Sequence, residues 1–307
     1  MICTLTLHPA VDRVLRVEGL PGGRGLVRSE LVALLAAGKG FNVSRDLAVR
    51  GHRSIAAGVV GRPELGFYES SFGELGVELL LEAIPAPTRC NITLLSADSG
   101  GELHLRERGR EVPAGALVSL AERMSQRLGP ADTVAACGSL PGLDAAGLAS
   151  ALRLFRGRGA RVLLDSSGEA LGPAVRGAAD VLKVNADELG EIVGSVPQTV
   201  EHAVGAAREV LGECPGRVLV TLGQAGAVAV SGEGAWKAAA PRVEAVNTVG
   251  AGDAFTAGFL SAEGKGTPEA LRVAVAWGAA QAASGHIGLL EAERVEGLEA
   301  QATVSEA

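Results

Sequence analysis

The chain has 307 residues, of which 47% are hydrophobic, and its formal net charge is −7. A chain of this size can bury a large core, and no apolar run approaches the ~18 residues that predict a membrane-spanning helix. The negative charge disfavours nucleic acid and anionic membranes as partners, because both attract basic surfaces. Small anionic ligands remain allowed, since they need only a local group of cationic side chains.

The amino terminus and the cysteines favour a cytoplasmic location. Residues 1–7 resemble a first β-strand and lack the basic start and the cleavage site of a secretory signal. The cysteines lie far apart and form neither a C-x-x-C pair nor a Cys/His cluster of the kind that binds metal. We therefore expect reduced and mostly buried thiols at Cys3, Cys90, Cys137 and Cys214.

The first third of the chain contains four segments that read as extended strands, and they lie at residues 11–17, 25–35, 89–95 and 102–106. Among them lie a helical run at residues 44–50 and a strand at residues 54–60. We expect lid strands, drawn from about 11–35 and 88–107, to form a small sheet over a cleft. Such a lid excludes water from a reacting phosphate, whereas the alternative is a set of ordinary edge strands.

After residue 110, predicted strands alternate with amphipathic helices. The strands lie at residues 133–137, 161–165, 181–184 and 217–222, and the helices at 114–127, 145–156 and 200–211. This alternation predicts a mainly parallel sheet with helices on both faces. No repeat or linker divides the chain, so one domain should span residues 1–307, ending in a frayed tail at 301–307.

The segment Asn247–Gly258 carries the strongest functional signal. Gly250, Ala251 and Gly252 precede an apolar helical run, where backbone N–H groups and the helix dipole favour an anion. Asp253 follows directly and could accept a proton from an attacking hydroxyl during phosphoryl transfer. The alternative is that Asp253 only caps the helix.

Two earlier motifs offer groups that bind sugars or phosphates. Gly38, Lys39 and Asn42 belong to a glycine-flanked turn that lacks the spacing of a P-loop but supplies ammonium and amide donors. Asp12 follows a strand broken by Pro9 and could accept sugar hydroxyls. For both motifs the alternative is an ordinary turn. We interpret the neighbouring His8 as a structural residue.

Three further motifs follow predicted strand ends. Ser139 exposes a hydroxyl in a turn, and Thr221, Gly223 and Gly226 belong to a second, glycine-rich turn. Asn185 and Glu188 are three residues apart, so that both would lie on one helical face and could hold magnesium-bound water. Helix capping is the alternative for this pair.

Together these motifs resemble the PfkB carbohydrate kinase family of the ribokinase-like superfamily, and within it the branch of 1-phosphofructokinases and tagatose-6-phosphate kinases. The resemblance runs from residue 4 to about 285 and rests on residues 6–13, 38–43, 138–141, 165–168, 185–188 and 248–253. It implies a three-layer α/β/α domain with a mainly parallel sheet and a small β-sheet lid. It also implies ATP and Mg²⁺ as cofactors and a homodimer formed through the lid.

The resemblance implies a role for each matched residue. Asp253 would be the catalytic base, and Gly250, Ala251 and Gly252 would form the anion hole. Asn185 and Glu188 would organise Mg²⁺ through water. The nucleotide would lie against Lys183, Asn185, Thr221, Gly223, Gly226, Ala279 and Ala280, and the sugar hydroxyls against Asp12, Gly38 and Asn42.

A substrate that already carries phosphate needs cations at the far end of the cleft, and the candidates are Lys39, Arg89 and Arg106, with Ser139 adding a hydroxyl. We therefore expect a kinase that converts fructose 1-phosphate to fructose 1,6-bisphosphate. Tagatose 6-phosphate or fructose 6-phosphate is the alternative substrate, and a regulator that binds without turnover is the alternative class. The segment 103–109 departs from the family pattern, which bears on sugar identity.

Overall fold

The computed structural model describes residues 1–19, 26–97, 101–109, 111–140, 144–213, 216–284 and 290–307. Its largest element is a ten-stranded sheet. The strands are β1 (Ile2–Thr6), β4 (Ser54–Gly61), β5 (Glu78–Ile84), β8 (Thr133–Cys137), β9 (Arg161–Asp165), β10 (Val181–Asn185), β11 (Arg217–Thr221), β12 (Ala227–Ser231), β13 (Gly234–Ala239) and β14 (Thr303–Glu306). They are arranged in the order β14-β13-β12-β11-β10-β9-β8-β1-β4-β5.

The sheet is parallel from β11 to β5, and β12, β13 and β14 add antiparallel strands at one edge. Every residue of β4 is buried, and only the first residue of β8 is not. Strands buried on both faces are expected when helices cover both sides of a parallel sheet. The alternation in the sequence therefore predicted the correct sheet type.

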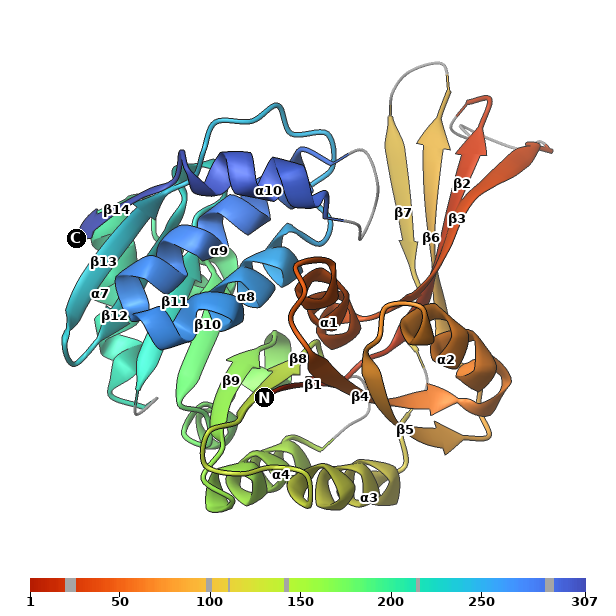
Figure 1. The fold of residues 1–307 in the computed structure, drawn as a ribbon, viewed down its shortest axis with the longest axis horizontal. Coiled ribbons are helices and arrows are strands. Elements are labelled where there is room, and N and C mark those ends of the chain that lie inside the picture. The colour runs from red at the N-terminus through yellow and green to blue at the C-terminus, as the bar shows by residue number, and fades with distance from the viewer. Residues whose placement is uncertain (20–25, 98–100, 110, 141–143, 214–215, 285–289) are drawn as a thin grey trace.

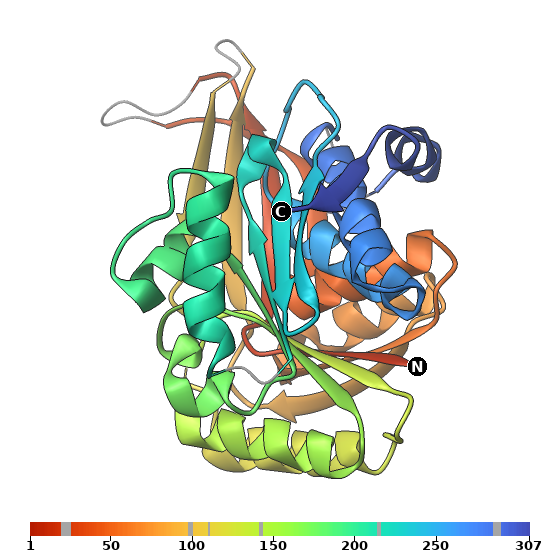
Figure 2. The same cartoon turned by 90° about the vertical axis from the view of Figure 1, so that its left-hand side faces the viewer.

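Helices cover both faces of this sheet. One hydrophobic cluster joins the sheet to α3 (Ala114–Ser125), α4 (Ala145–Gly157), α5 (Pro173–Arg176), α6 (Ala186–Val193) and α7 (Val200–Leu211). A second cluster joins the other face to α1 (Lys39–Val49), α8 (Ala251–Ala262), α9 (Thr267–Ala282) and α10 (Ala292–Glu299). Figure 2 shows the strands between green helices on one side and blue helices on the other. The predicted three-layer α/β/α architecture is confirmed.

A third cluster, around Phe41, Tyr68 and Phe72, packs α2 (Leu65–Gly73) against α1. The structure also contains short 3₁₀ helices, namely η1 (Arg62–Glu64), η2 (Gly168–Leu171), η3 (Gly223–Ala225) and η4 (Glu263–Lys265). Within the described residues, no helix is both long and apolar enough to cross a bilayer.

A separate four-stranded sheet stands out from the main body (Figure 1). We call it the lid sheet, and its strands are β2 (Ala10–Val17), β3 (Ser29–Ala37), β6 (Arg89–Ser96) and β7 (Glu102–Arg106), in the order β3-β2-β6-β7. All four extended segments of the sequence prediction are present, but β3 begins at Ser29 rather than at residue 25, which lies outside the described residues. Helix α1 begins at Lys39, five residues before the predicted run.

The prediction of a frayed carboxyl terminus is wrong. Strand β14 pairs antiparallel with β13, from Thr303 opposite Ala239 to Glu306 opposite Trp236. Val304 is half-buried against the second hydrophobic cluster. Short terminal segments with mixed polarity read as tails in a sequence, and only the unpaired edge of β13 makes this one a strand.

Deleting residues 303–307 should lower the free energy of unfolding by about 1–3 kcal/mol, because it removes the pairing with β13 and the burial of Val304. Thermal and urea unfolding of the truncated chain and the full chain measure the difference. Ser305→Ala, at an exposed position of the same strand, is the control and should unfold like the parent. An unchanged midpoint for the truncated chain would mean that β14 adds no stability.

Candidate active site

The parallel strands bring the predicted site residues to one edge of the sheet. Asp165 ends β9, Asn185 ends β10 and Thr221 ends β11, while Ser139 follows β8. The carboxyl ends of parallel strands lie at the same edge, and this edge is where open α/β sheets bind ligands. The site is therefore assembled from segments that are far apart in sequence.

Helix α8 begins at this edge with unpaired backbone donors. Gly250 is the N-cap residue and has φ of 83°, a left-handed conformation that favours glycine. The N–H of Ala251 donates to the carbonyl of Thr248 over 3.2 Å, but in the described part of the chain the N–H groups of Gly250, Gly252 and Asp253 have no partner. Three such donors at a helix start form a site suited to an anion.

Asp253 lies in the first turn of α8 and is only 6% exposed. It does not cap the helix, because Gly250 holds that position, so the capping alternative is wrong. Its Oδ2 accepts a hydrogen bond of 2.8 Å from Nδ2 of Asn42 on α1. Packing of α1 against α8 thus brings together two candidates that are 211 residues apart.

Burial raises the pKa of Asp253 to about 6, with Lys39 opposing the shift and Asp165 adding to it. A carboxyl group with this pKa is ionised at neutral pH, yet it is a much stronger base than an exposed aspartate. The environment therefore suits Asp253 to the removal of a proton from a hydroxyl group.

Asp165 is a second buried carboxylate, and the sequence motifs predicted no role for it. Its Oδ1 is 3.0 Å from Nζ of Lys39 and 3.2 Å from Nζ of Lys183, and its Oδ2 accepts a hydrogen bond of 2.8 Å from Thr256. Burial alone would raise its pKa, but Lys183 and Lys39 outweigh burial and hold the pKa at about 2. The sequence signal that could have identified Asp165 is an acidic residue at the last position of a predicted strand.

The two lysines differ in exposure. The side chain of Lys183 is 5% exposed, whereas that of Lys39 is 34% exposed. Asp165 therefore fixes both ammonium groups, and only Lys39 also has substantial access from solvent. A cation held in this way can contact a ligand without a large loss of side-chain entropy, because its position is already fixed.

The predicted sugar-binding residues lie at the junction of β1, α1 and the lid sheet. Gly38 precedes α1, and Asp12 on β2 accepts a hydrogen bond of 2.7 Å from Asn91 on β6. Ser139 Oγ is 3.1 Å from Nδ1 of His8. Burial, with a smaller effect of Arg89, lowers the pKa of His8 to about 4, so its ring is neutral at pH 7.

The two predicted phosphate-binding arginines also lie on the lid sheet. Arg89 donates to the carbonyls of His8, Pro9 and Glu107, so its guanidinium has a fixed direction. Arg106 is exposed at the end of β7 and lies opposite Asn91. Lys39 instead contacts Asp165, so it belongs to the group of charges around Asp253.

A cavity of about 340 Å³ lies beyond the carboxyl ends of β10 and β11. It is lined by Asn185, Thr221 and Gly223 from the predicted nucleotide set, with Thr199 and Leu222 among the other lining residues. A glycine is required at position 226 by the fold, because a Cβ atom there would clash with the carbonyl oxygen of Ala238. Ala279 and Ala280 lie on α9 within the second hydrophobic cluster and do not line this cavity.

Asn185 and Glu188 form a capping box at the start of α6. Asn185 Oδ1 accepts from the N–H of Glu188, and Glu188 Oε2 accepts from the N–H of Asn185, each over 2.8 Å. Within the described residues no three acidic, histidine or cysteine side chains cluster as metal ligands. A single half-buried carboxylate still fits Mg²⁺, which keeps several waters and binds mainly through substrate phosphates.

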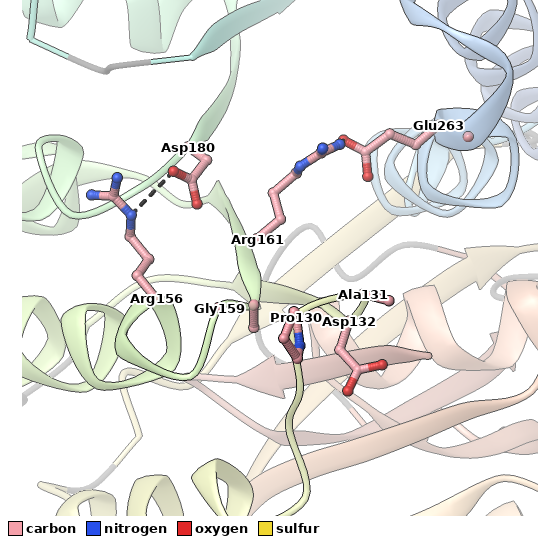
Figure 3. A pocket seen from close by; sticks show the side chains of 10 residues that line it. Pro130, Ala131, Asp132, Arg156, Gly159, Arg161, Asp180 and Glu263 are labelled. Carbon is pink, nitrogen blue, oxygen red and sulfur yellow. Dashed lines mark hydrogen bonds and ion pairs between the residues drawn. The ribbon is translucent and has the colours of Figure 1, made fainter.

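A larger cavity, of about 480 Å³, lies at the opposite edge of the sheet (Figure 3). Its charged side chains neutralise one another: Arg156 pairs with Asp180 and Arg161 with Glu263. Asp132 in its wall binds the amino-terminal ammonium group. Because these charges are already paired, the smaller cavity beyond β10 and β11 is the better candidate for binding a ligand.

Replacing Asp253 with asparagine should stabilise the protein at pH 8 by up to about 3 kcal/mol, because a buried charge is removed. The folded-state pKa of about 6 lies above the ordinary 3.8, so ionisation of Asp253 destabilises the fold above pH 6. The gain should therefore shrink as the pH falls from 6 to 4. Urea unfolding of the variant and the parent at several pH values measures this difference in the free energy of unfolding.

Asp165→Asn is the matched control for this prediction. Its pKa of about 2 lies below 3.8, so the ionised form stabilises the fold at neutral pH, and the substitution should destabilise the protein. Opposite signs for the two variants are expected at pH 8. Equal signs would contradict the assigned charge states.

Three comparisons place this chain among known proteins. The family model "pfkB family carbohydrate kinase" matches residues 7–289. The 1-phosphofructokinase of Rhodobacter capsulatus is 34% identical over 99% of this chain and 97% of its own length, and that of Bacillus subtilis is 33% identical over 95% of each.

Solved structures agree with this result. Phosphofructokinase-2 from Escherichia coli in complex with potassium superposes with a TM-score of 0.91 at 25% identity, over 98% of both chains. The ribokinase of Arabidopsis thaliana shares the fold with a TM-score of 0.77 at 21% identity, over 97% of this chain and 98% of the other. The family match over most of the length, the ribokinase-like fold and the buried acid at the start of α8 together show that the chain belongs to the pfkB family of carbohydrate kinases.

Proposed function

We propose that this protein is an ATP-dependent sugar-phosphate kinase that converts fructose 1-phosphate to fructose 1,6-bisphosphate. The observation that carries the proposal is the position of Asp253, buried at the start of α8 between unpaired amides and Lys39. The relatives named 1-phosphofructokinase, similar over nearly the whole chain, support this choice of substrate.

Asp253 acts as the general base. Its carboxylate removes the proton from the acceptor hydroxyl as the oxygen attacks the transferred phosphorus, and the raised pKa lets it hold that proton near neutral pH. Asn42 donates to the same carboxylate and holds it in place. A base positioned in this way contributes chiefly by orientation, since phosphoryl transfer needs little covalent chemistry from the protein.

The free N–H groups of Gly250, Gly252 and Asp253 stabilise negative charge on the transferred phosphoryl group. Lys39, fixed by Asp165 and partly exposed, supplies a cation on the α1 side of the site. Asn185 and Glu188 would hold Mg²⁺ through water, and the ion would supply positive charge for the phosphates of ATP. The cavity beyond β10 and β11, with Thr221 and Gly223 in its wall, takes the nucleotide.

Arg89, Arg106 and Ser139 bind the phosphate that the substrate already carries. Arg89 is fixed by three carbonyls, and Arg106 is exposed near it on the lid sheet. Arginine suits this role, because its planar group donates two bonds to one phosphate. Since the lid sheet also carries Asp12, its position determines both phosphate and sugar contacts.

Asp253→Asn should lower kcat by several orders of magnitude while ATP still binds, because the amide cannot accept the proton. ADP release is measured with fructose 1-phosphate, fructose 6-phosphate and tagatose 6-phosphate, and nucleotide binding by calorimetry. Asp132→Asn, at the opposite edge of the sheet, is the matched control and should keep parental rates.

The outcome distinguishes the candidate functions. Highest kcat/KM on fructose 1-phosphate supports the proposal, whereas a preference for either 6-phosphate assigns the alternative substrate. If the parent protein binds nucleotide but releases no ADP with any of the three sugar phosphates, it is a regulator instead. Full activity of Asp253→Asn would exclude this carboxylate as the base.

We also propose that two copies of the chain associate through their lid sheets. β3 and β7 are the edges of the lid sheet, and exposed apolar side chains gather on and beside them, namely Leu26, Val27, Leu31, Val32, Leu34, Leu103 and Leu105. Exposed edge strands with apolar side chains favour pairing with another chain. A second copy of this protein presents the same apolar surface, and pairing of the two copies can bury both surfaces.

Replacing Leu31 and Leu34 together with glutamate should convert the dimer to a monomer, because four charges would face one another across the interface. Sedimentation velocity measures the oligomeric state at several concentrations. Leu154→Glu is the control, since Leu154 is 37% exposed on α4, away from the lid sheet, and should leave the dimer intact. A monomeric parent protein would refute lid-mediated association.

A further inference from the structure

The guanidinium of Arg45 is buried behind the proposed catalytic base. Arg45 lies on α1 and is 4% exposed. Its Nη1 donates to Oδ1 of Asn42 over 3.0 Å, and its Nη2 donates to the carbonyl of Ala36 near the end of β3. The charged group also lies 5.2 Å from the centre of the Phe72 ring. Arg45 therefore has fixed partners on α1, α2 and the lid sheet.

Burying this cation is costly, and no carboxylate offsets the cost directly. Burial lowers the pKa of Arg45, opposed by more distant attraction to Asp46, Asp12 and Asp253. In the described part of the chain, no acidic side chain forms an ion pair with it within 4.0 Å. A buried charge that contacts neutral oxygens destabilises the fold unless those contacts are strong. This arrangement therefore suggests a role beyond stability.

The chemistry of the two side chains gives that role. A guanidinium can only donate hydrogen bonds, so the atom of the Asn42 amide that faces Arg45 must be its oxygen. The NH₂ group of the same amide then faces Asp253, where it donates over 2.8 Å. Without Arg45, only the charge of Asp253 would favour this orientation, and the amide could turn by 180° whenever that carboxyl group is protonated.

We propose that Arg45 is a positioning residue: it fixes the orientation of the Asn42 amide so that the amide donates to Asp253 during catalysis. The proposal rests on the proposed function, because it assigns Arg45 to the same base. It explains why Arg45 is buried on α1 although none of the acidic side chains that the structure describes forms an ion pair with it. Through Ala36, the same guanidinium also holds the end of the lid strand β3 next to the base.

Other charged groups act on Asp253 and must stay constant in a test. They are Lys39 and Asp46 on α1, Asp165 on β9 and Lys183 on β10. Asp46 is buried, and among the described residues its Oδ1 has no hydrogen-bond partner. Burial, with a smaller effect of Asp253, raises the pKa of Asp46 well above its ordinary range.

A double-mutant cycle on Arg45→Met and Asn42→Ala tests the proposal. Each single variant should lower kcat by about 10- to 100-fold, the usual cost of losing an outer partner of a site residue. In the Asn42→Ala background, Arg45→Met should cost less than about 3-fold more, because its target is already absent. Asn42 also faces the sugar, so the cycle is evaluated on kcat with saturating substrates rather than on KM.

The pH profile separates positioning from general loss of packing. In the parent, kcat should fall below a pH near 6 as Asp253 takes up a proton. Arg45→Met should move this limb upward by about one pH unit, since the ionised base loses a hydrogen bond and a nearby positive charge. Arg50→Met is the matched control. The guanidinium of Arg50 also donates to one carbonyl, that of Ala292, and to one side chain, that of Glu296. This variant should leave the acidic limb of the pH profile unchanged.

Asn42→Asp keeps the proposal testable even if Arg45→Met does not fold. The new carboxylate can still accept from Arg45, but it has no NH₂ group for Asp253, so kcat should fall at least as far as in Asn42→Ala. Parental kcat in Asn42→Asp, additive losses in the cycle, or an unshifted limb in folded Arg45→Met would each overturn the proposal. An inactive parent would instead refute the proposed function.

Discussion

The structure depends on holding two buried carboxylates at one sheet edge in opposite electrostatic environments. Asp165 binds two lysines and has a pKa of about 2, whereas Asp253 has one hydrogen-bond donor from a neighbouring side chain and a pKa of about 6. Separated pKa values of this kind assign roles, since the strong acid stays ionised as a structural anion and the weak acid can exchange a proton. Lys39 and Lys183 must therefore converge on Asp165 from α1 and β10.

Helix α1 connects the parts of the site. Its first residue, Lys39, reaches Asp165. Three residues further on, Asn42 donates to Asp253 and accepts from Arg45, and the strand before the helix belongs to the lid sheet. Tyr68 ties the same region together by donating to the carbonyls of Ala10 and Ala37 at the base of β2 and β3. A movement of the lid sheet would therefore first displace the residues that surround Asp253.

Local patterns in the sequence predicted most elements, including the bounds of β8, β9 and α7, because apolar periodicity and turn residues act over short range. They failed for β14, whose pairing partner is distant in sequence, and they placed the start of α1 too late, since Gly38 and Lys39 read as a turn. The motif at residues 247–258 correctly placed a helix start after glycine. It did not exclude a cap at Asp253.

The sequence by itself determined the fold class, the family resemblance and the candidate base, because each depends on residue types at fixed spacing along the chain. Only the tertiary structure decided which charges meet. That Asp165 binds Lys39 and Lys183 and that Asn42 donates to Asp253 both depend on contacts between distant elements. Burial, which sets the pKa of Asp253, is likewise a property of the packed molecule.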